Sequence, residues 1–237
     1  MIIPTQVPDH NKLCIAERYE KDLHIPKTIA VLGATGNQGK SVATHFLSLD
    51  WNVRDITRNV SSPSSQALSS RGIRMVEADI DNPSSLLTAF RGAHIIFAVT
   101  DFWSPFFASF GERKKISDRA TGEHACAIEV RRGNMIIDAV AQVMREEGSA
   151  LERFIFSTFP VFKGLSGGKH SYVYYFDSKA EVSAYLKQRD DGKLWEKSSL
   201  SNMGFYMTNL LEYGEVVGAV KVGHLFSSQN ISRNCRR

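Results

Sequence analysis

Short runs of apolar residues alternate along this chain with longer segments in which apolar residues recur every three or four positions. The runs are typical of strands buried on both faces of a parallel sheet, and the longer segments are typical of helices that cover such a sheet. We expect strands over Thr28–Leu32, Trp51–Thr57, Ile73–Ala78, Ala93–Thr100 and Phe154–Thr158. We expect a Ser/Pro loop over residues 61–65, and helices over 38–49, 83–90, 120–147 and 177–188.

The regular alternation of strands and helices predicts the architecture. Each helix returns the chain to the start of a parallel neighbouring strand, so the fold class is α/β, with a doubly wound parallel sheet of the Rossmann type. We divide the chain into an N-terminal extension (1–26), a Rossmann domain (27–192), and a small, shortened C-terminal lobe with a polar tail (193–237). Ligands of such sheets bind beyond the carboxyl ends of the strands, so we examine the residues that follow each strand.

Composition and charge are those of an ordinary globular protein. The 237 residues are 43% hydrophobic and 23% charged, and the net charge is only +4. A charge this small does not indicate a nucleic-acid surface, and no apolar stretch is long enough for a signal peptide or a membrane span. The three cysteines lie far apart, which favours neither a disulfide framework nor a metal site. We therefore expect a cytoplasmic protein without metal, membrane or direct nucleic-acid binding.

A glycine-rich turn follows the first expected strand and opens the first expected helix. It consists of Gly33, Ala34, Thr35, Gly36, Asn37, Gln38 and Gly39. In dinucleotide-binding domains, the first glycine permits a sharp turn, the second lets backbone N–H groups approach the pyrophosphate, and the third lets helix and sheet pack closely. Turns need glycine for other reasons too, but here the strand before and the helix after complete the motif. The sequence therefore predicts a bound dinucleotide.

The residue after the second expected strand distinguishes between the two nicotinamide dinucleotides. An acid there would hold the ribose 2′-hydroxyl of NAD, whereas an arginine accommodates the 2′-phosphate of NADP. The strand ends at Thr57, and Arg58 follows it. Asp55 lies inside the strand, from which its side chain need not reach the site. The alternative is that Arg58 is a solvated surface residue. NADP is the cofactor that the pattern favours.

With these residues in hand, the chain resembles the NmrA-like branch of the atypical short-chain dehydrogenases. The similarity runs from about Thr28 to Leu211. It rests on GATGNQG (33–39), TRN (57–59), the Ala78-Asp79 pair, AVTDFW (98–103), FDSKAEV (176–182) and FYMTNLL (205–211). Proteins of this kind are either reductases or non-catalytic NADP(H) sensors that regulate a transcription factor or another partner.

The resemblance implies an NADP site built from several segments. It implies that the glycine-rich turn binds the pyrophosphate, that Arg58 binds the 2′-phosphate, and that Lys179 contacts the nicotinamide ribose. Asn59, next to Arg58, is also an implied cofactor contact. The remaining implied cofactor contacts are Asp79 and Ile80 at the adenine, Thr100, Asp101 and Phe102 beside the ribose and nicotinamide, and Tyr206, Met207, Thr208 and Asn209 over the cofactor.

Catalysis depends on the segment YVYYFDSK (172–179). Tyr175 and Lys179 have the Y-x-x-x-K spacing of an acid–base pair, in which the ammonium would lower the pKa of the phenol. Ser157, or Thr158, could polarise the same substrate oxygen. Three tyrosines within four residues make a chance match possible, however, and Asp177 has the character of a helix N-cap, which would leave Tyr175 before the helix. Tyr175 could then serve in packing or in shielding the cofactor.

Three functions remain open at this point. The first is an NADP-dependent reductase of a small carbonyl or enone compound. The second is a redox sensor, cytoplasmic or nuclear, whose partner binding depends on NADP(H). The third is a cofactor-binding remnant, because the expected C-terminal lobe is short and would exclude water incompletely. The aromatic loop 101–107 fits a pocket wall, a docking surface, or a loop folded onto that lobe.

Overall fold

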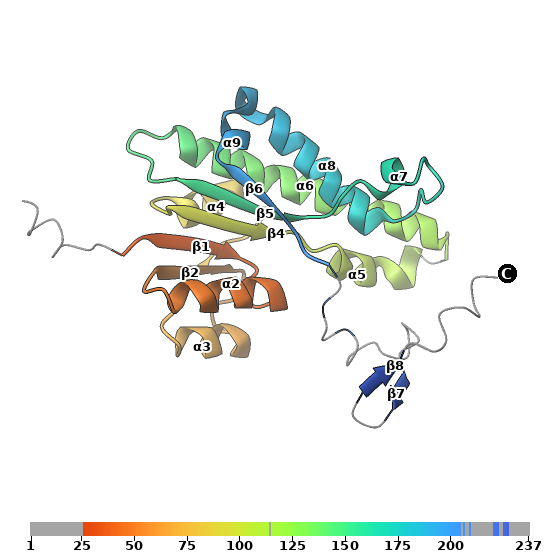
Figure 1. Cartoon of the computed structure of the whole chain (residues 1–237), viewed down its shortest axis with the longest axis horizontal. Coiled ribbons are helices and arrows are strands. Elements are labelled where there is room, and N and C mark those ends of the chain that lie inside the picture. The colour runs from red at the N-terminus through yellow and green to blue at the C-terminus, as the bar shows by residue number, and fades with distance from the viewer. Residues whose placement is uncertain are drawn as a thin grey trace, which may run out of the picture. The chain divides into compact units, whose positions relative to one another are not determined.

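A computed structural model describes residues 26–113, 115–204, 206, 209, 220–222 and 225–227 of the chain. Its main sheet has six strands in the order β3-β2-β1-β4-β5-β6, and Figure 1 shows this sheet with its helices. The strands are β1 (Thr28–Leu32), β2 (Asn52–Thr57), β3 (Arg74–Glu77), β4 (Ile95–Val99), β5 (Arg153–Thr158) and β6 (Ser198–Asn202). This is the strand order of a dinucleotide-binding Rossmann sheet. The expected α/β fold class is confirmed.

Helices connect these strands along the chain. They are α2 (Asn37–Leu47), α3 (Pro63–Ser69), α4 (Pro83–Phe90), α5 (Trp103–Arg113), α6 (Asp118–Arg145), α7 (Phe162–Leu165), α8 (Tyr174–Gln188), the short 3₁₀ helix η1 (Arg189–Gly192) and α9 (Lys193–Glu196). A separate antiparallel pair joins β7 (Val220–Val222) and β8 (Leu225–Ser227). The part of the chain that the structure describes contains no helix both long and apolar enough to cross a bilayer.

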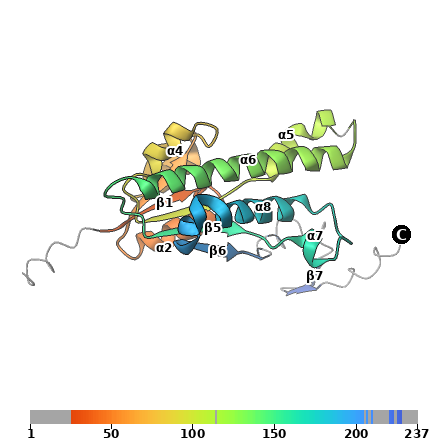
Figure 2. The ribbon, with the colours of Figure 1, turned by 90° about the horizontal axis from the view of Figure 1, so that it is seen from above.

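The chain divides into two compact units. The first contains residues 1–99, 135–154 and 189–197, and the second contains 100–134, 155–188 and 198–237. In the first unit β1 pairs in parallel with β2 on one side and β4 on the other, and β2 pairs in parallel with β3. Figure 2 shows α2 and α4 on opposite faces of these strands. β1 is at the centre of this core, because Ile29, Ala30 and Val31 have no exposed surface.

Local capping residues explain why one expected helix start is confirmed and why one expected loop is wrong. The expected helix start at Pro83 is confirmed, with Asn82 as N-cap accepting the Ser85 N–H. The expected 61–65 loop is wrong, because α3 begins at Pro63 inside it. Ser62 is the N-cap of α3.

The expected start of α8 and the expected aromatic loop are also wrong. α8 begins at Tyr174, three residues before Asp177, so Tyr175 lies within the helix. The aromatic residues after β4 form the helix α5 instead of a loop. This helix starts where the Asp101 side chain accepts the backbone N–H groups of Trp103 and Ser104, at 2.9 and 3.1 Å.

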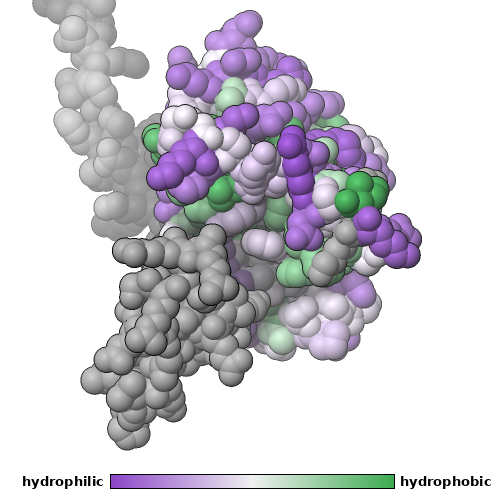
Figure 3. All heavy atoms as spheres, turned by 90° about the vertical axis from the view of Figure 1, so that its right-hand side faces the viewer, coloured by the Kyte–Doolittle hydropathy of each residue, from purple (hydrophilic) through white to green (hydrophobic). Residues whose placement is uncertain are grey.

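The surface is mostly polar on the side drawn in Figure 3, where hydrophobic side chains form small separate patches. Large hydrophobic side chains with substantial exposure include Leu165 in α7 and Phe107 and Trp103 in α5. Scattered exposed apolar residues are normal on a protein surface, so exposure alone identifies no interface here.

Within the second unit, α6 and α8 pack closely because glycines of α6 face side chains of α8. A Cβ added at Gly122 would lie 2.5 Å from Tyr174 Cδ2, and one added at Gly133 would lie 2.4 Å from Val182 Cγ2. Real Cβ atoms do not approach other atoms this closely. The two glycines therefore set the distance between the helices.

The helix spacing gives a stability prediction. Gly133→Ala should lower the free energy of unfolding by about 1–3 kcal/mol, because the stiff Val182 side chain cannot move away without disturbing the core. Gly111→Ala in α5 is the matched control, since nothing lies within 4 Å of its added Cβ. The control should gain about 0.5–1 kcal/mol from helix propensity. Urea denaturation of both variants measures the difference, and equal stabilities would contradict the close packing.

Candidate functional site

The glycine-rich turn of the first unit has the geometry that its sequence predicts. Gly33 has φ +94°, a left-handed conformation that favours glycine, and its added Cβ would lie 2.9 Å from Val99 Cγ1. The Gly36 N–H donates to the Gly33 carbonyl at 3.0 Å and closes the turn. A Cβ at Gly39 would lie 2.4 Å from the Gly33 oxygen, so α2 lies directly against the turn. Gly33 and Gly39 are thus required by the fold itself.

Gly36 differs from the other two glycines. It is the N-cap of α2 with φ −90° and ψ 169°, an extended conformation that any residue adopts. An added Cβ would make only ordinary contact, 3.5 Å from the Gly33 oxygen. No side chain caps the helix, and its first turn holds no acidic residue. The structure therefore does not need glycine here, and the lack of a side chain leaves the helix N-terminus open to an anion.

A buried carboxyl group, for which sequence reasoning assigned no role, lies under this turn. Asp55 of β2 is completely buried, and its Oδ1 accepts the Ala34 N–H at 3.2 Å. Its Oδ2 has no hydrogen-bond partner among the described residues. Burial raises the pKa of Asp55 to about 6, partly opposed by backbone hydrogen bonds from Ala34 and Ile56. Asp55 is therefore a support of the glycine-rich turn that sequence reasoning missed.

The raised pKa predicts how stability depends on pH. The folded chain binds the Asp55 proton more tightly than the unfolded chain, whose pKa is near 3.8. This contribution is complete below the unfolded pKa and is lost as pH rises through about 6. Between pH 4 and 7, the free energy of unfolding of wild type should fall by on the order of 2 kcal/mol relative to that of Asp55→Asn. Urea denaturation across this range measures it, with Asp50→Asn, an exposed turn position, as control.

The other residues expected near the adenine end lie at the surface of the first unit. Arg58 and Asn59 are exposed directly after β2, and the Arg58 guanidinium forms no ion pair or hydrogen bond with the described residues. Asp79 is exposed and Ile80 is half-buried after β3. The Asp79 carboxylate accepts the Asp81 N–H at 3.0 Å. Arg58 therefore has a charge available to a phosphate, while the Asp79 side chain shapes its own loop.

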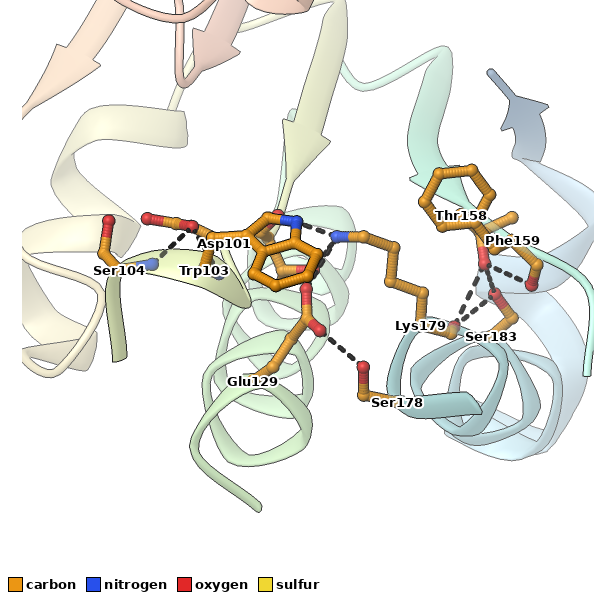
Figure 4. A network of polar contacts seen from close by, with 10 residues as sticks. Asp101, Trp103, Ser104, Glu129, Thr158, Phe159, Ser178, Lys179 and Ser183 are labelled. Atoms are coloured by element: carbon orange, nitrogen blue, oxygen red, sulfur yellow. Dashed lines mark hydrogen bonds and ion pairs between the residues drawn. The ribbon is translucent and has the colours of Figure 1, made fainter. Parts of the chain in front are cut away.

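In the second unit, Lys179 is the centre of a buried polar network (Figure 4). Its Nζ donates to the Thr100 carbonyl at 2.7 Å, to Thr100 Oγ1 at 2.8 Å and to Glu129 Oε1 at 2.6 Å. The Thr100 hydroxyl in turn donates to Glu129 Oε1 at 2.6 Å. All three ammonium hydrogens therefore have acceptors. The network therefore fixes the backbone at Thr100.

Glu129 is the network member that the sequence did not indicate. It is completely buried in α6, and its second carboxylate oxygen accepts the Ser178 hydroxyl. Sequence reasoning missed it because its charged partner is identified only by the fold: Lys179 is 50 positions away. An acid on the apolar face of a helix could have indicated this residue. The segment around residue 129 is rich in polar residues, however, so the apolar face of the helix is difficult to recognise from the sequence.

Tyr175 lies one helical turn before Lys179, as the Y-x-x-x-K spacing requires. Its half-buried ring packs against Phe102, Trp103, Phe159 and Phe176, with centroids 4.6 to 6.1 Å away. The expectation that the ammonium lowers the phenol pKa is wrong, because burial raises the pKa of Tyr175. The Lys179 ammonium itself is bound by Thr100 and Glu129. The hydroxyl forms no hydrogen bond with the described residues, so it is available to another molecule.

The other residues expected in the site of the second unit have the following surroundings. Ser157 is 4% exposed at the end of β5, and the Thr158 hydroxyl lies 2.7 Å from Ser183 Oγ and 3.0 Å from the Lys179 carbonyl oxygen. Asp101 caps α5, and Phe102 is buried beside it. Tyr206 is half-buried, which raises its pKa, and its carbonyl accepts the Asn209 N–H. The expected cofactor residues Met207 and Thr208 lie outside the described residues.

A pocket of about 680 Å³ opens in the second unit between the loop after β5, α8 and β6. Its wall includes the apolar side chains of Phe159, Val161 and Leu200. Lys163 and Asp177 contribute charge, and the Lys163 N–H donates to Asp177 Oδ1 at 3.1 Å. The volume suits a small organic molecule.

Comparison with known proteins agrees with this geometry. The model of the NmrA-like family matches residues 26–219. The chain belongs to the NmrA-like family. A curated relative, the NmrA-like family domain-containing oxidoreductase FrzB of a Cladobotryum species, is 31% identical over 186 residues, which are 77% of this chain and 48% of the relative. The oxidoreductase himF of Aspergillus japonicus is 31% identical over 65% of this chain and 40% of its own length. This NmrA-like chain thus spans less than half of these relatives.

Solved structures show the same fold. NmrA, a negative transcriptional regulator determined in complex with NADP, superposes with a TM-score of 0.57 at 22% identity over 78% of this chain and 47% of its own. Because the identity is low, this likeness establishes the fold of the NmrA-like chain and nothing further.

Proposed function

We propose that this NmrA-like chain is the cofactor-binding part of an NADP(H)-dependent oxidoreductase that reduces a small carbonyl or enone compound. The observation that carries the proposal is the glycine-rich turn. Its first and third glycines are required by the fold, while Gly36 is not and leaves the N-terminus of α2 open. Backbone N–H groups at such an N-terminus suit a pyrophosphate. The oxidoreductase names of the curated relatives support the same assignment.

NADP is the proposed dinucleotide because of the residue that follows β2. The Arg58 guanidinium is exposed and available, and a guanidinium pairs with a phosphate through two parallel hydrogen bonds. Asp55, the acid of this strand, is buried under the turn with Oδ1 on the Ala34 N–H, so it is unsuited to hold a ribose hydroxyl. NmrA itself has been determined with NADP and also with NAD, so the fold alone does not decide between them.

The proposed chemistry divides between the cofactor and the side chains of the second unit. When bound, NADPH supplies the hydride. Tyr175 donates a proton to the substrate oxygen, since its hydroxyl is unbonded and its raised pKa keeps it protonated at neutral pH. Lys179, one helical turn away and paired with Glu129, binds the Thr100 carbonyl.

Cofactor titrations test this proposal. NADPH should bind more tightly than NADH, as measured by the change in tryptophan fluorescence. Arg58→Glu should weaken NADPH binding by roughly 10–100-fold, because a charge-assisted phosphate contact is replaced by repulsion, and should leave NADH binding nearly unchanged. Arg71→Glu, an exposed arginine elsewhere in the first unit, is the matched control. A preference for NADH in wild type would overturn the choice of NADP.

The alternative is a non-catalytic NADP(H)-sensing regulator of a transcription factor or another protein. The exposed rings of Trp103 and Phe107 in α5, 47% and 66% accessible, stack with centroids 5.8 Å apart, and this continuous apolar surface favours the alternative as one that a partner could cover. NADPH binding without NADPH oxidation across a panel of aldehydes, ketones and enones would support the sensor. If no protein is retained in a pull-down in a way that depends on NADPH, the result would count against the sensor.

A further inference from the structure

We infer that Glu129 is a positioning residue that fixes α8, and with it both Tyr175 and Lys179, beside Thr100. The inference rests on the proposed function for its catalytic meaning. Its physical basis is the completely buried Glu129 carboxylate, which binds two consecutive residues of α8 through separate oxygens (Figure 4).

The two contacts constrain α8 in a way that one contact could not. Oε1 accepts the Lys179 ammonium and Oε2 accepts the Ser178 hydroxyl, so α8 can neither rotate nor slide without losing one of them. Gly133 lies one turn further along α6 and lets Val182 of α8 approach closely. The acid and the glycine therefore act on the same helix pair, the first by orientation and the second by distance.

The network also connects α8 to Thr100. Thr100 Oγ1 donates to Glu129 and accepts from Lys179, and its carbonyl accepts from the same ammonium. Tyr175 is four residues before Lys179 on α8, so its position depends on the same contacts. Because Lys179 is only 6% exposed, removing Glu129 would leave a buried cation without its counter-charge.

A double-mutant cycle tests the inference. Glu129→Gln and Lys179→Gln are made singly and together, and Asp118→Asn is the control, because Asp118 is an exposed carboxylate in the first turn of the same helix. The NADPH dissociation constant is measured for each. We expect Glu129→Gln to weaken NADPH binding roughly tenfold in wild type and not at all when Lys179 is already replaced. Additive losses would mean that Glu129 acts independently of Lys179, and would overturn the inference.

Thermal unfolding provides the second arm and does not require a bound cofactor. Each single variant leaves one buried charge, whereas the double variant leaves none, so the double variant should melt about 10 °C above either single variant. Folding of the double variant where Glu129→Gln fails to fold would also support the pairing. A double variant that melts below both single variants would overturn it. If wild type does not bind NADPH, the proposed function fails, and the melting temperatures still decide the role of Glu129.

Discussion

Replacing Gly39 with alanine is expected to abolish NADPH binding and to destabilise the fold. The added Cβ would lie 2.4 Å from the Gly33 oxygen and 2.7 Å from the Ala34 nitrogen, which are backbone atoms that cannot rotate away. The turn and α2 must then separate, which disorders the N–H groups that would bind the pyrophosphate. We expect a loss of about 2–4 kcal/mol in the free energy of unfolding and more than roughly 100-fold in NADPH affinity. Urea denaturation measures the free energy of unfolding, and titration calorimetry measures the NADPH affinity.

Gly36→Ala separates the two effects. Its Cβ meets only ordinary contacts, so the variant should unfold at nearly the same urea concentration as wild type. If the N-terminus of α2 binds a pyrophosphate, the new methyl group stands where the phosphate oxygens approach, and NADPH binding should still weaken. Gly39→Ala with normal NADPH binding would contradict the assignment of this turn. Gly36→Ala that binds NADPH as wild type does would show that the ligand approaches elsewhere.

The central strands could be predicted from the sequence because a strand that is buried on both faces consists of consecutive apolar residues. β1 was predicted with its observed bounds, since its apolar run lies between Pro26 and Gly33. β6 was not predicted, because Ser198–Asn202 is an edge strand with a polar sequence and contains no fully buried residue. Pairing with the sheet defines such a strand, and pairing is not visible in its own residues.

In the candidate site too, local motifs could be predicted from the sequence, and contacts between distant residues could not. The glycine-rich turn is a local motif of seven residues, so its geometry follows from sequence alone. Asp55 and Glu129 were not predicted as site residues, because their roles arise from contacts 21 and 50 positions away. The pKa of Tyr175 was predicted in the wrong direction, because the fold buries the phenol and burial raises its pKa. Spacing places Lys179 near the tyrosine, but the fold directs its ammonium to Thr100 and Glu129.

Tyr175→Phe is expected to lower kcat by about 10²–10⁴-fold while leaving the NADPH dissociation constant unchanged. The substitution removes only the hydroxyl, and the phenyl ring can remain against Trp103 and Phe176. Tyr172→Phe is the matched control, because Tyr172 is 63% exposed beside Arg119 and lies outside the aromatic cluster. Steady-state kinetics with NADPH and a carbonyl substrate measure the effect. Full activity in Tyr175→Phe would exclude this phenol as the proton donor.

The pH profile checks the same assignment independently. Burial raises the pKa of Tyr175 above its ordinary value of 10, so the phenol stays protonated throughout the physiological range. A group that must be protonated to act supports turnover below its pKa and loses it above. The kcat of wild type should therefore be flat from about pH 6 to 9 and fall only at higher pH. A kcat that falls between pH 6 and 8 would instead assign the proton to a group with a much lower pKa, and Tyr175 would then act only through packing.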